Sequence, residues 1–240
     1  MRVSVLLYLI VVSSLLLIGN TSSYFKDTEK SCNNTLTAGA AYIANHLVIS
    51  EVQIKGDGDG DHDFVEIYNP TDSDINLSDY KGDYVKLVKY TSTGSKYVIK
   101  SWKNDFSVVP SHGFYLWASS KDSNYPSTIG ADCSTKKNIG SNNAIALEFP
   151  NGSIIDLVGW GSSIVNETLS FPFNPQNNQS IERKALFSSD NTTMSYGEDA
   201  CLGNGHDTDN NYNDFILRNH SDSQNSSSPK EEPPWPPYGG

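Results

Sequence analysis

Short runs of alternating apolar and polar residues dominate the chain and predict β-strands. In residues 47–54, Val48, Val52 and Ile54 share one side of an extended segment. In residues 64–69, Val65 and Ile67 share one side, with the polar and aromatic residues opposite. Because successive side chains of a strand point to opposite faces, each run predicts a strand with one face toward a core.

Further segments of the same kind follow at intervals set by turn residues. The turn Pro150-Asn151-Gly152 predicts a hairpin of two paired strands. We expect the core-facing side chains of this hairpin to be Ile145, Leu147 and Phe149 on the first strand and Ile155 and Leu157 on the second. No helical period or heptad repeat extends over a long window. The predicted strands after the first two are residues 84–90, 97–102, 113–118, 144–149, 153–158, 180–185 and 215–217.

Six motifs in a fixed order carry a family resemblance: LVISEVQIKGDGDGDHDFVEIYNP (47–70), INLSDY (75–80), GFYLWA (113–118), IIDLVGWG (154–161), SIERK (180–184) and DTDNNYNDF (207–215). Together they resemble the lamin-tail domain over residues 47–217. The resemblance implies an all-β, immunoglobulin-like β-sandwich. It also implies attachment or accessory roles in extracellular proteins. Nuclear lamins carry a coiled-coil rod that this chain lacks, so a filament function does not transfer.

The 240-residue chain divides by composition into four parts. Residues 1–23 hold one charge, an apolar run and then small residues, which predicts a signal peptide; an uncleaved N-terminal anchor is the alternative. Residues 24–45 are a polar linker, and 46–218 are the predicted sandwich. Residues 219–240 are rich in Ser and Asn and then in Pro, which predicts a disordered tail. A recognition peptide anchored by Trp235 and Tyr238 is the alternative for this tail.

Net charge and glycosylation motifs also favour an exported protein. A formal charge of -11 argues against nucleic-acid binding, which normally needs a basic surface. Sequons for N-glycosylation are more frequent than chance predicts, although an Asn- and Ser-rich chain also generates them. They begin at Asn20, Asn33, Asn76, Asn151, Asn166, Asn178, Asn191, Asn219 and Asn225.

The chain has three cysteines, an odd number for an exported protein. Cys133 and Cys201 both lie within the predicted sandwich, so we expect a disulfide between them. Cys32 is then a free thiol, an intermolecular partner, or a replacement for either member of the pair.

Two acidic runs suggest a calcium site. Asp57, Asp59, Asp61 and Asp63 alternate with other residues, as hard oxygen ligands do in calcium loops. Asp207, Asp209 and Asn211 repeat this spacing. The alternative is that these side chains cap turns and face solvent. Neighbouring His62 and His206 would complete a zinc or hydrolytic site only if the two runs met in space.

The sequence therefore predicts a secreted or cell-surface lamin-tail protein that acts as a binding, adhesion or structural module. It contains no G-x-S-x-G motif and no recognisable Cys–His arrangement, so we expect no catalytic residues. No cofactor is required, although calcium is a candidate. The expected partner is an extracellular protein or a surface polymer, with membrane contact only through an uncleaved N-terminus. The alternative is a metal-dependent extracellular hydrolase or nuclease that uses the acidic loops.

Overall fold

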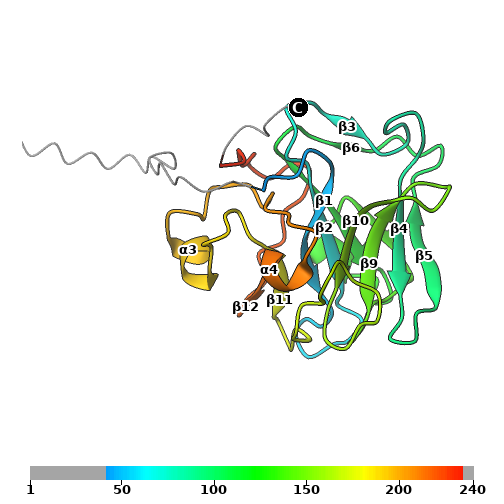
Figure 1. Ribbon diagram of the computed structural model, residues 1–240. Helices are drawn as coiled ribbons and strands as arrows, with labels where there is room; N and C mark the ends of the chain where they lie inside the picture. Colours follow the sequence, from blue (N-terminus) through cyan, green and yellow to red (C-terminus); the bar gives the residue numbers. More distant parts are fainter. Residues whose placement is uncertain (1–41, 235–240) are drawn as a thin grey trace, which may run out of the picture. The chain divides into compact units, whose positions relative to one another are not determined.

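Two β-sheets face each other in the computed structural model, which describes residues 42–234 (Figure 1). The larger sheet has the order β12-β11-β1-β2-β7-β8, and the smaller has the order β10-β9-β4-β5. All pairings are antiparallel except β7 with β8. Within the described range, no helix is long and apolar enough to cross a lipid bilayer.

The strands of the larger sheet are β12 (Phe215–Arg218), β11 (Ser180–Arg183), β1 (Val48–Gln53), β2 (Phe64–Tyr68), β7 (Phe114–Ser119) and β8 (Cys133–Thr135). Those of the smaller sheet are β10 (Ile154–Gly159), β9 (Ala144–Glu148), β4 (Lys86–Tyr90) and β5 (Lys96–Ser101). A short ribbon pairs β3 (Ile75–Asn76) with β6 (Val108–Val109). The short helices are α2 (Tyr125–Thr128), α3 (Asn191–Tyr196) and α4 (Asn211–Asp214).

The main core lies between the two sheets and takes apolar side chains from both. Its largest members are Trp102, Trp117 and Trp160, which are fully buried. Each fully buried aliphatic or aromatic side chain contributes about 1.5–3 kcal/mol relative to exposure. Trp160, in the motif of residues 154–161, is therefore a core residue. The fold class, an immunoglobulin-like β-sandwich, is confirmed.

The predicted strands all form, but two β-bulges change which side chains face the core. In β1 the register shifts between Ile49 and Glu51, so Val48 packs on the outer face of the sheet and Ile49 turns inward. In β10 it shifts between Ile154 and Asp156, so Leu157 packs outside the main core. Strict alternation predicted the opposite faces for Val48 and Leu157, because an extra residue in a strand reverses the pattern beyond it.

Residues 122–143, which lie between two predicted strands, contain both α2 and β8. Three residues of β8 pair in parallel with the end of β7. Thr135 then connects the sheets, since its hydroxyl accepts from Trp117 Nε1 at 3.0 Å and donates to the carbonyl of Ile99 at 3.1 Å. These two hydrogen bonds link the two sheets at the side of the sandwich where β8 and β5 are the edge strands.

Residues 219–234 differ from the predicted disordered tail, since they pack on the outer face of the larger sheet. Backbone N–H groups of Asp222 and Gln224 donate to the carboxyls of Glu51 and Glu66. The Ser- and Asn-rich composition gave no sign of this packing, because the partners are buried carboxyls on distant strands. Trp235 and Tyr238 lie outside the described residues, as do the predicted signal peptide, most of the linker, Cys32, Asn20 and Asn33.

The predicted disulfide between Cys133 and Cys201 is not formed in the structure. Cys133 lies on β8, one edge of the six-stranded sheet, whereas Cys201 follows α3, which contacts β12 at the opposite edge. Five strand spacings of about 4.8 Å separate those edges. A disulfide needs Cα atoms within about 7 Å, so the two residues are too far apart.

Cys133 should be an unreactive thiol in the folded protein. It is partly buried against the core, and burial raises the pKa of the thiol from its ordinary value of 9.0 to about 11. At pH 8 this shift lowers the thiolate fraction about a hundredfold, and the thiolate is the form that reacts. We therefore expect iodoacetamide to modify Cys133 at least about tenfold more slowly in the native protein than in denaturant, measured by peptide mass spectrometry.

A matched control moves the thiol by one residue. Ser134 is exposed on the same strand, so the variant Cys133→Ser/Ser134→Cys should react rapidly in the native state. Equal rates for native and denatured Cys133, or its recovery in a disulfide-linked peptide, would contradict the buried placement.

Candidate functional site

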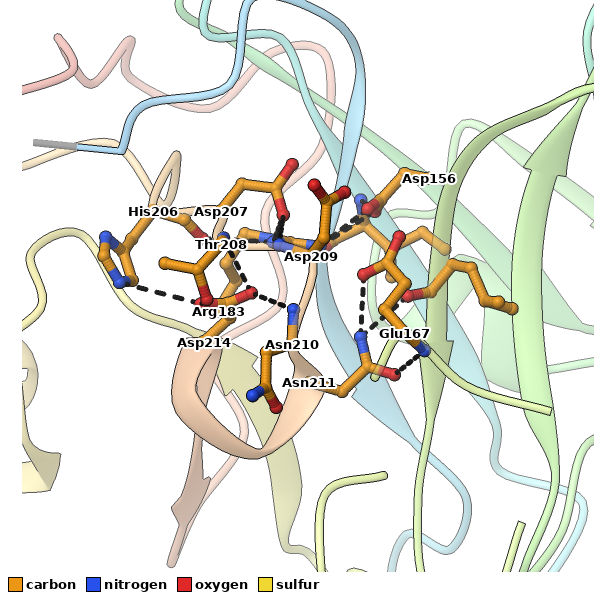
Figure 2. Close-up of polar contacts among 12 residues, drawn as sticks. Asp156, Glu167, Arg183, His206, Asp207, Thr208, Asp209, Asn210, Asn211 and Asp214 are labelled. Carbon is orange, nitrogen blue, oxygen red and sulfur yellow. Dashed lines mark hydrogen bonds and ion pairs between the residues drawn. The ribbon is translucent and has the colours of Figure 1, made fainter. Parts of the chain in front are cut away.

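Three carboxylates converge at the side of the sandwich where β10 and β11 lie close together (Figure 2). They belong to Asp156 on β10, Glu167 in the loop after β10, and Asp207 in the segment before α4. One oxygen of each lies within 4.8 Å of the others. Within residues 42–234, no other group of three acidic, His or Cys side chains comes this close. We call this group the carboxylate cluster.

The fully buried guanidinium of Arg183 on β11 holds the cluster together. Its Nη2 donates to both oxygens of Asp156, at 2.8 and 3.0 Å. Its Nη1 donates to Asp207 Oδ1 at 3.1 Å and to the His206 carbonyl at 3.0 Å, and its Nε donates to the Ile49 carbonyl at 3.0 Å. The planar fork of arginine suits such a bidentate contact, and every nitrogen of Arg183 has an acceptor.

The two β-bulges create this arrangement. The bulge in β10 turns Asp156 toward the other sheet, where its Oδ2 accepts from the Ile49 N–H at 2.6 Å. The bulge in β1 lies at the same Ile49, so the N–H of Ile49 is available to Asp156 and its C=O is available to Arg183. The ion pair therefore connects the larger sheet to the smaller one.

Asn211 supplies hydrogen-bond partners for backbone groups at the free edge of β10. Its Oδ1 accepts from the backbone N–H of Gly159 at 2.9 Å and of Glu167 at 3.1 Å. Its Nδ2 donates to the Leu157 carbonyl at 2.8 Å and to Glu167 Oε2 at 2.9 Å. All of its hydrogen-bonding capacity is used, so this buried amide is a structural connector and not a metal ligand.

The rest of the second acidic run builds the turn that carries Asn211. Asn210 caps α4 by accepting from the Tyr212 N–H, and Asp214 is fully buried. Asp214 accepts from the Thr208 N–H and hydroxyl and from the Asn210 N–H. The run therefore caps a turn, as the alternative predicted, but Asn211 and Asp214 are buried instead of facing solvent.

Burial and charge set the protonation of the cluster. Burial, with Asp156 nearby, raises the pKa of Glu167 to about 9, so this carboxyl is protonated at neutral pH. Burial alone would raise the pKa of Asp207, but Arg183 and His46 hold it below its ordinary value. His46 Nε2 lies 3.6 Å from Asp207 Oδ2.

The cluster has the oxygen donors of a divalent-cation site but already contains a cation. A calcium ion could take these carboxylates only by displacing Arg183. Removing one partner of a buried ion pair costs about 3–5 kcal/mol, because the other charge remains buried. The guanidinium of Arg183 thus occupies the place that a metal ion would take among the carboxylates. The cluster serves to join the two sheets.

A family model for the lamin tail domain matches residues 40–162, which is half of the chain. The chain belongs to the lamin-tail-domain family. The matched part includes β1 to β10, and β11 and β12 add the edge of the larger sheet beyond it. No curated protein matches the chain.

The first acidic run of this lamin-tail domain does not gather its carboxylates. Asp59 accepts from the Asp61 N–H at 2.9 Å, Asp61 lies 3.2 Å from Lys121 Nζ, and Asp57 accepts from Asn178 Nδ2 at 3.3 Å. Asp63 is buried and accepts from a backbone N–H, and burial raises its pKa to about 8. The carboxylates of the run are therefore held by separate partners, most of which come from distant parts of the chain.

The two histidines next to the acidic runs are likewise in separate places. His62 stacks on Tyr125 with ring centroids 4.3 Å apart and contacts Asp122 at 2.9 Å. His206 is buried against Phe187 and lies 3.6 Å from Asp214. The zinc alternative, which needed these runs to meet, receives no geometric support from the described residues.

The sequons differ in how accessible their asparagines are. Asn151 and Asn219 are exposed, so they are the sequon residues best placed to carry a glycan. The side-chain amides of Asn166, Asn178 and Asn225 donate to other groups of the protein. The half-exposed Asn76 ends β3 and accepts from the Ser78 N–H, and the half-exposed Asn191 is the first residue of α3.

Asp156 and Arg183 lie in motifs quoted above but were given no role, Asp214 was recognised only as part of the second acidic run, and Glu167 was not predicted. A usable signal existed, since a charged residue inside an apolar strand is normally paired. Asp156 lies between Ile155 and Leu157, and Arg183 follows Ile181 in the next strand. The pairing itself needed the bulges, which strand patterns do not predict.

Replacing Glu167 with Gln should flatten the pH dependence of stability. The carboxyl is protonated in the folded state up to about pH 9 but ionises above its ordinary value of 4.5 when unfolded. The protonated carboxyl of Glu167 therefore contributes fully to the free energy of unfolding below pH 4.5, and this contribution is lost as the pH rises to about 9. One such proton changes the free energy of unfolding by at most about 1.4 kcal/mol per pH unit.

Urea unfolding of the wild type and of Glu167→Gln at pH 6, 7, 8 and 9 measures this difference. The exposed Glu198→Gln is the matched control and should follow the wild type. If the wild type and Glu167→Gln lost stability in parallel, the buried, protonated state of Glu167 would be wrong.

Calcium should have little effect on stability, because the carboxylates of both acidic runs, except that of the exposed Asp209, have protein partners. We expect about 5 mM calcium to shift the melting temperature by less than about 1 °C, whereas occupied extracellular sites shift it by several degrees. Differential scanning fluorimetry in calcium and in EDTA measures this. A larger rise that is lost in Asp57→Asn/Asp59→Asn/Asp61→Asn would restore the calcium loop.

Proposed function

We propose that this lamin-tail protein is a secreted or cell-surface module that works by binding, in adhesion or in a structural assembly. Export is supported by the apolar N-terminal run and by the exposed sequons at Asn151 and Asn219. A binding role is supported by exposed apolar side chains on a loop that Asn211 and backbone hydrogen bonds hold in place. We take the expected partner to be an extracellular protein or a surface polymer.

The observation that carries the proposal is the loop of residues 161–175. Ile164, Leu169 and Phe173 on this loop are each more than half exposed. Tyr212 on α4 is also more than half exposed, and its N–H donates to the Leu169 carbonyl at 3.1 Å. Aromatic and large apolar side chains are the usual anchors of protein interfaces. We call these four side chains the loop patch.

The loop patch is built on fixed backbone. Phe171 and Gly159 are joined by an N–H···O bond of 2.8 Å, and Gly161 donates to the Phe171 carbonyl at 2.8 Å. Asn211 fixes Glu167 in the middle of the loop. A rigid loop loses little conformational entropy when a partner binds, which favours affinity.

The alternative of a metal-dependent hydrolase or nuclease has weaker support. Its best argument is the carboxylate cluster, but Arg183 already forms ion pairs with both Asp156 and Asp207. Glu167, with a pKa of about 9, would have to lose its proton before it could bind a metal ion. Metal-assisted hydrolysis also needs an open position on the ion for water, whereas Asp156 is buried.

A pull-down from the extracellular fraction tests the proposal, with residues 24–240 as bait in EDTA and in calcium. The loop variant is Leu169→Ser/Phe173→Ser/Tyr212→Ser. The control variant replaces three exposed aromatics elsewhere, Phe106→Ser/Phe187→Ser/Tyr196→Ser. We expect a partner that the wild type and the control capture in both buffers, with affinity at least about tenfold weaker for the loop variant.

Equal capture by all three baits would contradict the loop patch as the binding surface. Metal-dependent hydrolysis of a phosphate ester by the wild type, absent in EDTA, would favour the enzyme alternative.

A further inference from the structure

Three glutamates form a row on the outer face of the larger sheet, one on each of three neighbouring strands. Glu51 on β1 lies opposite Glu182 on β11 and opposite Glu66 on β2. Glu51 and Glu66 are almost completely buried, and Glu182 is mostly buried. Like charges directly opposite one another across strands are destabilising, and burial strengthens their repulsion. We call these residues the glutamate row.

Residues 219–234, the C-terminal strap, cross this row and cover it. The N–H of Asp222 donates to Glu51 Oε1 at 3.2 Å, and the N–H of Gln224 donates to Glu66 Oε2 at 2.5 Å. Two residues further on, the N–H of Ser226 donates to Asp132 Oδ2 at 3.0 Å. Every second residue from 222 to 226 therefore places its N–H on a carboxyl group of the sheet or of its edge.

Side chains fasten the strap at both ends. At its start, the Ser221 hydroxyl donates to Gln53 Oε1 at 2.7 Å. Near its end, Tyr68 donates its hydroxyl to the Glu231 carbonyl at 2.6 Å, and the Glu231 N–H donates to the His112 carbonyl at 2.9 Å. His112 Nδ1 lies 2.5 Å from Glu232 Oε2. The strap is thus a peptide with a turn at residues 225–228 that is docked on a sheet face by polar contacts.

The charges that face the row are mostly negative. Arg218 on β12 is the one cation among them, and its Nη1 lies 2.9 Å from Glu182 Oε2. The strap contributes Asp222 and Glu231, and Asp199 lines the same cavity of about 30 Å³, which has room for about one water. One guanidinium cannot balance these carboxyls, so the closed arrangement needs protons on several of them.

We propose that the outer face of the larger sheet is a peptide-docking surface that holds the C-terminal strap through protonated glutamates and releases it as the pH rises above neutrality. Burial raises the pKa of Glu51 to about 8 and those of Glu182 and Glu231 to about 7. Burial, with Glu51 opposite, also raises the pKa of Glu66.

The direction of the effect follows from proton linkage. When the strap is open, water reaches the row and the carboxyl pKa values return toward 4.5. The closed state therefore binds more protons than the open state between about pH 4.5 and 8. Closure is most stable below this window and weakens as the pH rises through it. The ratio of open to closed strap rises up to about tenfold per pH unit for each proton released.

Hydrogen–deuterium exchange of the full chain at pH 6, 7, 8 and 9 tests the proposal, with protection factors corrected for the intrinsic exchange rate. We expect strap peptides around Asp222 and Gln224 to lose protection at least about tenfold between pH 6 and 9. Peptides from β9 should keep their protection, because that strand is in the other sheet.

The variant Glu51→Gln/Glu66→Gln/Glu182→Gln keeps the acceptors but cannot ionise. Its strap should stay protected at every pH. If this variant does not fold, Glu66→Gln alone should reduce the loss of protection. The exposed Asp79→Asn is the control and should respond like the wild type.

Three results would each overturn the proposal. One is strap protection in the wild type that does not change with pH. Another is a Gln variant whose response equals that of the wild type. The third is simultaneous loss of protection in the strap and in β9, which would mean that the whole domain unfolds.

Discussion

The ion pair between Arg183 and Asp156 is the contact on which the arrangement of the two sheets depends. Arg183 comes from the larger sheet and Asp156 from the smaller, and both are buried. A buried charge without a partner costs several kcal/mol, so each charge is acceptable only while the other is in place. Asp207, the carbonyls of Ile49 and His206, and the Ile49 N–H satisfy the remaining polar groups. On the opposite side of the sandwich, Thr135 makes a lighter connection between the sheets.

Much of the sandwich could be predicted because strand patterns are local. Nine strands were expected at the right positions, since alternation and turn residues specify them within a few residues. The bulges at Ile49 and Asp156 could not be predicted, because they depend on the partner strand and the opposite sheet. The bulges place Val48 and Leu157 on the faces opposite to those predicted, and they also bring Asp156 to Arg183. The two unpredicted bulges therefore account both for the core residues that were assigned to the wrong face and for the carboxylate cluster that was not predicted.

Acidic runs are ambiguous in sequence because the same oxygens bind ions, cap turns and accept from backbone N–H groups. In the second run Asp214 and Asn210 build a turn, and Asp207 pairs with Arg183. The C-terminal strap is ambiguous in the same way. Its polar composition predicted disorder, yet its N–H groups meet buried carboxyls from residues more than 150 positions earlier. Partners this distant in sequence are visible only in the fold.

A double-mutant cycle on Asp156 and Arg183 tests the role of this ion pair most directly. The free energy of unfolding in urea is measured for the wild type, Asp156→Asn, Arg183→Gln and the double variant, beside a cycle on the more exposed pair Lys100 and Asp105. We predict a loss of about 3–5 kcal/mol for each buried single variant and a coupling of at least about 2 kcal/mol, against less than about 1 kcal/mol for the control pair. Losses that add to within about 0.5 kcal/mol would contradict the claim that this ion pair joins the two sheets.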